Sequence, residues 1–412
     1  MSKVQCVRGT YDSYGAAKRK MKKVVAEAST VVEKYGFEEI ETPIFEFTEV
    51  FARNLGDTSD IVTKEMYCFN DKGGESLTLR PEGTAGVVRA FVSNGMQQNL
   101  PVKLYYAGPM FRYERPQKGR QRQFTQFGVE LLGVETPQAD IEVIAMAYEF
   151  LEKLGLNGQV TVEINSLGDA ESREAYRTKL VSYLKEHYDE LSEDSKDRLE
   201  RNPLRVLDSK EECDKTVVEN APLYADSLNQ ASKEFFAKVL RGLDLLGIKY
   251  RINNRLVRGL DYYSHTVFEL TTDKLGAQGT VLAGGRYNGL VAQMGGGEVA
   301  GIGWACGVER LAMLLDEDIE LPRPVAVIPL GDDAEDKALE IAAMLRRAGL
   351  RVEQAYSGNM KKRMAKACKA NARKAVIIGS EELANAEAAV KDLDSGEQKN
   401  VKFNRLIEEL TA

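Results

Sequence analysis

Charged, aromatic and amide side chains share one face of a predicted β-hairpin. The segment VKLYYAGPMFRYE leads into the basic stretch RPQKGRQR and continues as QFTQFGVELLG, a pattern that predicts a long hairpin with a cationic tip. Because side chains alternate along a strand, Phe124, Gln126 and Glu130 are expected on one face, with apolar residues on the other. The same alternation places Arg112 and Glu114 together on the first strand. This face could bind a nucleotide, because phosphoryl chemistry depends mainly on placement and positive charge.

Two further features of the second strand favour a ligand site. Glu130 lies among apolar residues, where a buried carboxylate without a partner would be costly. Gly128, on the same face, is predicted to leave room for a ligand to approach the sheet. The motifs GxxxxGK[ST] and HExxH are absent, as is GxGxxG in a βαβ unit. A nucleotide would therefore be held by arginines and an aromatic ring.

Other elements are predicted around this hairpin. Apolar residues at helical spacing predict a helix at 15–35, and FEEIETPIF predicts an edge strand because it contains Pro43. Residues 77–92 predict a strand end, a turn and a helix. A charged, helical segment at about 169–235 predicts an inserted helical subdomain, and GGGEVAGIGWACGVERLAMLL predicts a glycine-rich strand leading into a helix. An edge strand is also a natural place for a second subunit to pack.

The sequence predicts two domains. LPRPV, at 321–325, places two prolines at a change of composition and marks a linker. After it, apolar strands alternate with helical segments, which predicts a small α/β domain with a largely parallel sheet at 326–412. Residues 1–320 are then expected to form an α+β domain on an antiparallel sheet.

The composition narrows the class of protein. A net charge of −7 argues against a protein that coats nucleic acid indiscriminately, although basic clusters occur locally, as at 361–374. The five cysteines form no CxxC pair, so neither a zinc site nor a disulfide framework is indicated. No apolar stretch approaches the roughly 20 residues of a membrane helix. A soluble, cytoplasmic protein is expected.

Several segments, in order along the chain, resemble one family. FRYE, RQRQF and GIGWACGVER resemble motifs 2 and 3 of class II aminoacyl-tRNA synthetases, and GFEEIETPIF resembles motif 1, the dimer strand. RGTYD, LRPEGT, LVRGLDYY and GGRYNGL are similar to signature segments of histidyl-tRNA synthetases. IIGSEELANAEAAVKDLDSGEQ resembles the end of that family's anticodon-binding domain, so the resemblance spans essentially the whole chain. It implies a class II catalytic domain with a helical insertion, followed by a small α/β anticodon-binding domain.

The resemblance implies an ATP site and a tRNA site. ATP would be held by Arg112 at the α-phosphate, Glu114 and Phe124 at adenine, and Arg120 and Arg310 at the γ-phosphate. Mg²⁺ would bridge the phosphates. The acceptor end of tRNA(His) would meet the basic loop at Gln117, Lys118 and Arg122.

A histidine site is implied beside the ATP site. Arg112 and Arg258 would be catalytic and would also contact L-histidine, with Arg258 beside its carboxylate and the α-phosphate. The α-amino group would meet Glu82, Thr84 and Gln126, and the ring nitrogens Glu130 and Tyr263. The remaining histidine-binding residues implied are Gly83, Tyr262 and Tyr287.

Several of these residues could instead have a purely structural role. Glu82 could simply be a carboxylate in the first turn of a helix, and Arg258 or Arg310 could form a surface ion pair. Tyr262 and Tyr263 would point to opposite faces of a strand, so one of them is expected in the core. Tyr287 could be a packed aromatic residue. The two histidines, at 187 and 265, are not expected to be catalytic.

The resemblance implies that the chain activates L-histidine with ATP and transfers it to tRNA(His) as a homodimer. A rival function is that of a non-catalytic regulatory subunit like the one that partners ATP phosphoribosyltransferase. Such paralogues usually lack the C-terminal domain, which this chain retains. A second rival is a class II synthetase for a different amino acid, such as threonine or proline, and a third is a protein that only binds RNA.

Overall fold

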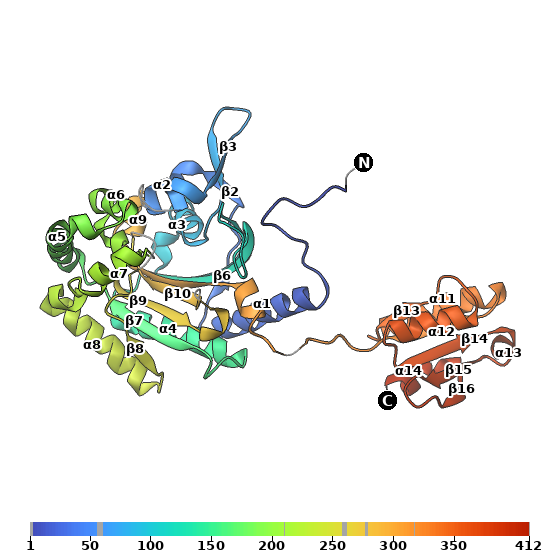
Figure 1. Cartoon of the computed structure of the whole chain (residues 1–412). Helices are drawn as coiled ribbons and strands as arrows, with labels where there is room; N and C mark the ends of the chain where they lie inside the picture. Colours follow the sequence, from blue (N-terminus) through green and yellow to red (C-terminus); the bar gives the residue numbers. More distant parts are fainter. Residues whose placement is uncertain are drawn as a thin grey trace. The chain divides into compact units, whose positions relative to one another are not determined.

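The computed structural model describes residues 3–55, 61–209, 211–257, 262–276, 279–316 and 318–411. Within it the chain forms two compact units, Met1–Asp318 and Ile319–Ala412 (Figure 1). The sheets and the apolar clusters of the first unit are separate from those of the second. Over the described residues, none of the helices has the length and apolar character needed to cross a membrane.

An eight-stranded sheet is the frame of the first unit. Its strand order is β1-β5-β6-β11-β10-β9-β7-β8; the inner strands pair antiparallel, and the two edge strands β1 and β8 run parallel to their neighbours. The strands are β1 (Glu38–Glu39), β5 (Val102–Phe111), β6 (Gln123–Leu132), β7 (Thr161–Ser166), β8 (Tyr250–Ile252), β9 (Ser264–Thr271), β10 (Thr280–Arg286) and β11 (Gly301–Gly307). The predicted hairpin is confirmed as β5 and β6, in which Leu104 is paired with Glu130.

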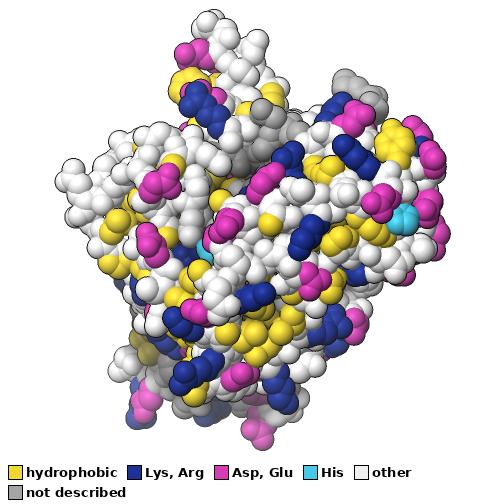
Figure 2. All heavy atoms as spheres, turned by 90° about the vertical axis from the view of Figure 1, so that its left-hand side faces the viewer, with side chains coloured by type: hydrophobic (Ala, Val, Ile, Leu, Met, Phe, Trp, Pro, Cys, Tyr) yellow, Lys and Arg dark blue, Asp and Glu magenta, His cyan; other side chains and the backbone are white. Residues whose placement is uncertain are grey.

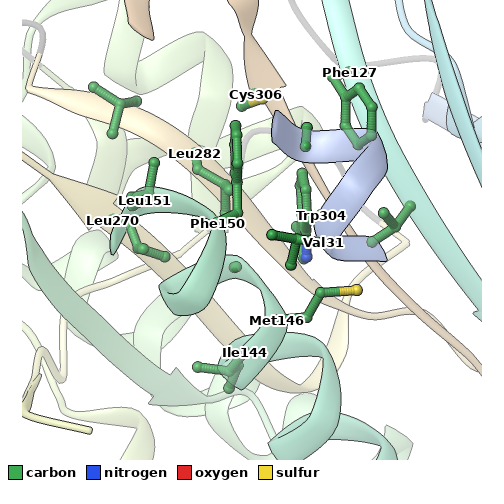
Figure 3. Close-up of a cluster of buried hydrophobic side chains, with 14 of the residues drawn as sticks. Val31, Phe127, Ile144, Met146, Phe150, Leu151, Leu270, Leu282, Trp304 and Cys306 are labelled. Atoms are coloured by element: carbon green, nitrogen blue, oxygen red, sulfur yellow. The ribbon is translucent and has the colours of Figure 1, made fainter. Parts of the chain in front are cut away.

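One face of this sheet is filled by an apolar core. The helices that contribute to it are α1 (Gly15–Lys34), α4 (Pro137–Lys153), α8 (Gln230–Leu245) and α10 (Val308–Ala312). The ring centroid of Trp304 lies 5.8 Å from that of Phe127 and 6.0 Å from that of Phe150, and Figure 3 shows this stack among aliphatic side chains. Phe127, Val129 and Leu131 all belong to this core, as strand alternation predicts. Their polar neighbours in β6 must therefore face the other way.

The segment FEEIETPIF forms two short strands, so the prediction of a single strand was wrong. Its first part is β1 in the large sheet, and its last part is β2 in a separate three-stranded sheet ordered β2-β4-β3. The bounds of these elements and the adjoining helices are β2 (Phe45–Phe47), β3 (Tyr67–Asn70), β4 (Ser76–Leu79), α2 (Thr48–Leu55) and α3 (Thr84–Ser93). The break lies near Pro43, which has no N–H to donate, and the Arg80 guanidinium holds the preceding carbonyl of Thr42 at 2.8 Å.

Helices occupy the segment at about 169–235 in which the sequence predicts an inserted subdomain. It comprises α5 (Ala170–Glu186), α6 (Glu193–Arg201), α7 (Glu212–Glu219) and the first part of α8. Helix α8 runs past residue 235 to Leu245 and buries Val239 and Leu243 in the core of the large sheet. Buried Asp214 joins three parts of the insertion, since its carboxylate accepts hydrogen bonds from Ser192, Ser195 and Ser209. Basic and acidic side chains are interspersed on the face that carries α5 and α8 (Figure 2).

The second unit is a five-stranded α/β layer structure. Its strand order is β13-β12-β14-β15-β16; the first three strands are parallel, and the last two form an antiparallel hairpin. Its elements are β12 (Val325–Pro329), α11 (Glu335–Arg347), β13 (Val352–Gln354), α12 (Met360–Lys369), β14 (Lys374–Ile378), α13 (Ser380–Ala384), β15 (Glu387–Asp392), β16 (Gln398–Lys402) and α14 (Leu406–Thr411). A largely parallel sheet was predicted; the hairpin makes the sheet mixed. Helices α11 and α12 pack into different clusters, one on each face of the sheet.

Candidate active site

A cavity of about 980 Å³ in the first unit is lined by most of the residues singled out from the sequence. Its walls come from the hairpin β5–β6, from β10 and β11, and from the start of α3. The predicted residues that line it are Glu82, Thr84, Arg112, Glu114, Arg120, Phe124, Gln126, Glu130, Tyr262, Tyr263, Tyr287 and Arg310. The two arms of the hairpin and Arg310 therefore converge on one space, as strand alternation requires.

Glu130 is the most deeply buried carboxylate in this wall, with 2% of its surface exposed. Its two oxygens accept hydrogen bonds from the Thr84 hydroxyl at 2.7 Å and from the Tyr287 hydroxyl. Burial raises the pKa of Glu130 to about 8, although these two hydrogen bonds oppose the shift. The nearby Glu82 carboxylate raises it further, so the free protein at neutral pH holds Glu130 mainly in its neutral form.

Three tyrosines surround this carboxylate. The ring centroid of Tyr262 lies 4.7 Å from that of Tyr263 and 5.7 Å from that of Tyr287. One of the two was expected in the core; in the structure both belong to an apolar core cluster and both also line the cavity. Strand β9 begins only at Ser264, so the two tyrosines precede the strand and do not alternate across it. The backbone of the following His265 has a φ of 45°, which interrupts regular extension at this point.

Glu82 lines the cavity and also accepts hydrogen bonds from the backbone of α3. Its two oxygens accept hydrogen bonds from the N–H groups of Thr84 (2.7 Å) and Ala85 (2.8 Å), at the beginning of that helix. Glu82 is thus a carboxylate at the start of a helix and, at the same time, a part of the cavity wall. Burial raises the pKa of Glu82, while these hydrogen bonds and the charge of Arg112 oppose the shift.

Gly83 and Gly128 lie against a tyrosine that the sequence did not reveal. Gly83 is not among the lining residues; its N–H donates to the Gln126 side-chain oxygen at 2.9 Å. A Cβ at either glycine would collide with the ring of Tyr106, which faces Gly128 across the hairpin. The space above Gly128 is therefore filled by Tyr106, so the prediction that Gly128 leaves room for a ligand to approach the sheet was wrong. The Tyr106 hydroxyl is 3.2 Å from the same Gln126 oxygen and so helps to hold the Gln126 side chain in place.

The glycine-rich strand β11 closes the wall beside Glu130. Cβ atoms at Gly301 and Gly303 would collide with the Tyr287 ring and the Glu130 carboxylate, respectively. The neighbouring residues Ile302 and Trp304 point into the apolar core instead. Glycines on this face therefore let two functional side chains lie directly on the sheet.

The other end of the cavity is cationic. Arg112 donates to the Pro81 carbonyl at 2.8 Å, and its guanidinium lies 5.4 Å from the centroid of the Phe124 ring. Arg120 donates to the Glu114 carboxylate at 2.8 Å. Burial and the charge of Arg120 lower the pKa of Arg310, so these two cations repel each other across the cavity. A polyanion placed between them would relieve that repulsion.

The polar residues in the loop between β5 and β6 differ in how exposed they are. Gln117 and Lys118 are exposed at the tip. Arg122 is half-buried: its guanidinium lies 3.9 Å from the Tyr113 ring centroid, and its backbone N–H donates to the Gly9 carbonyl at 2.7 Å. Arg122 is thus positioned to attach the N-terminal segment to the loop, in addition to any contact with RNA. Arg258 falls outside the described residues.

Some lining residues were missed by the sequence reasoning. Tyr11 and Lys20 come from the N-terminal segment and α1, and Glu309 comes from α10. Glu309 accepts two hydrogen bonds from the backbone N–H of Thr125, at 2.8 and 3.0 Å, and so joins α10 to the hairpin. No local pattern marks these residues, because only the folded chain brings their segments to the cavity. Neither histidine, at 187 or 265, is among the lining residues.

Metal ligands do not cluster in the described part of the chain. Within it, no group of three or more histidine, cysteine, aspartate or glutamate side chains has the arrangement to hold a metal ion. The cavity is lined by arginines and carboxylates, a set suited to phosphates and to a small polar ligand.

Comparisons with known proteins agree with this geometry. A family model described as histidyl-tRNA synthetase matches residues 9–311, and one described as anticodon binding domain matches residues 324–412. A histidine–tRNA ligase of Rhodospirillum rubrum is 60% identical over 402 residues, which cover 97% of each chain. The chain belongs to the histidyl-tRNA synthetase family. The histidine–tRNA ligase of Gluconobacter oxydans is a second member of the family, 55% identical over 412 residues, which cover 100% of this chain and 99% of that protein.

A solved structure extends the similarity to the fold. The structure of apo histidyl-tRNA synthetase from S. aureus covers 100% of both chains with a TM-score of 0.83 and 37% sequence identity. The predicted fold class is confirmed: an antiparallel-rich catalytic fold of the class II type with a separate C-terminal α/β domain of the anticodon-binding type. The cavity lies within the part of the chain that the synthetase model matches.

Proposed function

We propose that this chain is a histidine–tRNA ligase, which activates L-histidine with ATP and transfers it to the 3′ end of tRNA(His). The observation that carries the proposal is the pairing, within one cavity, of a buried carboxylate held by two hydroxyls and a set of arginines at the opposite end. Membership in the synthetase family supports the same reaction.

The carboxylate end is suited to histidine. Glu130 and Tyr263 would meet the two imidazole nitrogens, and an analogue that lacked one nitrogen would leave a buried polar group unpaired. The α-amino group would lie near Glu82, Thr84 and Gln126. Tyr262 and Tyr287 would enclose the ring.

The cationic end is suited to ATP. Phe124 would stack on adenine and Glu114 would contact it, while Arg112 would hold the α-phosphate, and Arg120 and Arg310 the γ-phosphate. The histidine carboxylate would attack the α-phosphorus in line, releasing pyrophosphate and leaving histidyl-adenylate. A carboxylate that is already ionised needs no general base, so Arg112 and Arg258 would act by alignment and charge neutralisation. Mg²⁺ bound to the phosphates would neutralise part of their charge.

The two domains would divide the recognition of tRNA. The exposed Gln117 and Lys118, with Arg122, would meet the acceptor end beside the cavity. Residues 1–320 would form the catalytic domain, with an insertion at about 169–235, and residues 326–412 would bind the anticodon. The basic helix α12 is a candidate RNA contact in that second domain.

We propose that the chain forms a homodimer and that the three-stranded sheet is the interface between its subunits. Phe45, Phe47 and Phe69 are 53%, 48% and 44% exposed on β2 and β3, and neighbouring Ile44 is 42% exposed. A group of large apolar side chains on one exposed sheet is typical of a subunit interface. A cytoplasmic location accords with a translation enzyme and with cysteines that form no disulfide among the described residues.

Pyrophosphate exchange across the amino acids tests the proposal. Exchange that requires histidine supports it, whereas exchange with threonine or proline would identify a different class II synthetase. Histidine binding without exchange would favour a regulatory subunit like that of ATP phosphoribosyltransferase, and tRNA binding without any dependence on ATP would favour an RNA-binding protein. Arg112→Ala and Arg258→Ala should each abolish exchange while leaving the protein folded.

A further inference from the structure

The second unit carries an exposed aromatic ring beside a row of lysines. Tyr356 is 82% exposed in the loop between β13 and α12, and Met360, at the first position of α12, is 36% exposed. Lys362, Lys366 and Lys369 are exposed along α12 at spacings that place them on one side of the helix. We call these three residues the lysine stripe. A large exposed ring next to several cations is an arrangement that binds single-stranded nucleic acid, through base stacking and phosphate contacts.

The topology of the sheet places Tyr356 at the carboxyl edge of its parallel strands. Parallel strands β12 and β13 are neighbours, but the chain leaves β12 toward α11 on one face and leaves β13 toward α12 on the other. In α/β proteins ligands bind outside the carboxyl ends of the parallel strands. Tyr356 follows the end of β13 by two residues, so it lies at this edge of the sheet.

Hydrogen bonds hold the loop that carries Tyr356 in place. Arg363, whose side chain is only 11% exposed, donates to the Gly358 carbonyl at 2.6 Å and to the carbonyl of Pro329 at the end of β12. The Asn359 side chain accepts a hydrogen bond from the Lys362 N–H at 3.1 Å and begins α12. An exposed ring on a fixed loop loses little conformational freedom when it stacks, which favours binding.

The lysine stripe differs from other lysines of this unit. Lys374 and Lys399 form ion pairs with Glu409, at 3.6 and 2.8 Å. The three stripe lysines form no ion pair with any residue in the described part of the chain. Acidic residues such as Asp332 follow β12 instead, so a phosphate backbone is expected on the α12 side of this edge of the sheet.

We propose that Tyr356 stacks on an unpaired base of the tRNA bound by the second unit, while the lysine stripe contacts the neighbouring phosphates. The inference rests on the proposed function, which supplies tRNA as the partner, and it assigns residues that the proposal leaves open. Because residues 324–412 match an anticodon-binding model, the base is expected in the anticodon loop. The phosphate contacts would supply affinity, and the ring would favour a loop over a duplex.

Replacement of Tyr356 tests the stacking contact. Tyr356→Ala should lower kcat/KM for tRNA(His) in aminoacylation by about 5- to 100-fold, the range expected for the loss of one stacked base. Histidine-dependent pyrophosphate exchange without tRNA should be unchanged, because that reaction uses only the first unit. Tyr356→Phe keeps the ring and should retain aminoacylation within about two-fold of wild type. Leu339→Ala, which removes a 58% exposed side chain from α11, is the matched control and should have no effect.

An abasic nucleotide in the tRNA identifies the partner base. If Tyr356 stacks on a given base, removing that base and the tyrosine together should cost no more than either change alone. Lys366→Gln should reduce the dependence of tRNA binding on salt concentration by about one phosphate contact.

An unchanged kcat/KM for tRNA in Tyr356→Ala, or a loss of pyrophosphate exchange in that variant, would overturn the inference. If the wild-type protein showed no exchange, the proposed function would fail, while direct titration of tRNA against the Tyr356 variants would still decide the stacking contact.

Discussion

The burial of Glu130 predicts that the stability of the first unit depends on pH. The carboxyl group is 2% exposed and is held by two hydroxyls, and burial raises its pKa from 4.5 to about 8. The folded protein therefore binds this proton more tightly than the unfolded chain does. The resulting stabilisation is fully present below about pH 4.5 and is lost as the pH rises through about 8.

The size of this effect follows from linkage. With a pKa of about 8 in the folded state and 4.5 in the unfolded state, the group contributes about 2.7 kcal/mol at pH 6 and almost nothing at pH 9. Glu130→Gln retains the shape of the side chain but removes its titration. Between pH 6 and pH 9 the wild type should therefore lose about 2.5 kcal/mol more unfolding free energy than the variant.

Urea unfolding at a series of pH values measures this difference. Trp304 is the one tryptophan of the sequence and is buried beside the cavity, so its fluorescence reports the first unit alone. Glu114→Gln is a suitable control, because it removes a carboxylate that has an arginine partner and should follow the wild-type profile. Parallel pH profiles for wild type and Glu130→Gln would refute the assignment of a neutral, buried Glu130.

Three further changes test other parts of the first unit. Gly128→Ala should cost about 1–3 kcal/mol of unfolding free energy and raise the KM for histidine, because the new methyl group displaces Tyr106; an unchanged urea midpoint would contradict this. Asp140→Asn should destabilise the first unit by about 3–5 kcal/mol, since it leaves the fully buried Arg286 guanidinium without its anion. Urea unfolding measures that loss, and a double replacement by leucine and methionine should recover much of it. Arg310→Ala should raise the KM for ATP in pyrophosphate exchange at least about 10-fold while leaving the KM for histidine nearly unchanged, in keeping with a charge-assisted phosphate contact.

The sequence by itself determined the hairpin and the composition of its two faces. Alternation in β6 is a local property, because an apolar core on one side forces Gln126 and Glu130 to the other. The glycine-rich strand β11 and the helical insertion were also evident from local pattern. The family could be predicted because its motifs are short, ordered segments of the chain.

The tertiary structure decided what occupies the space beside each residue. Gly128 suggested room for a ligand, but only the pairing of β5 with β6 places the Tyr106 ring over it. Tyr262 and Tyr263 both line the cavity because β9 starts after them, and strand boundaries are set by pairing with distant segments. The continuation of α8 to Leu245 likewise depends on the core it completes. Local patterns fix which way a side chain can point, whereas contacts between segments far apart in sequence fix what it meets there.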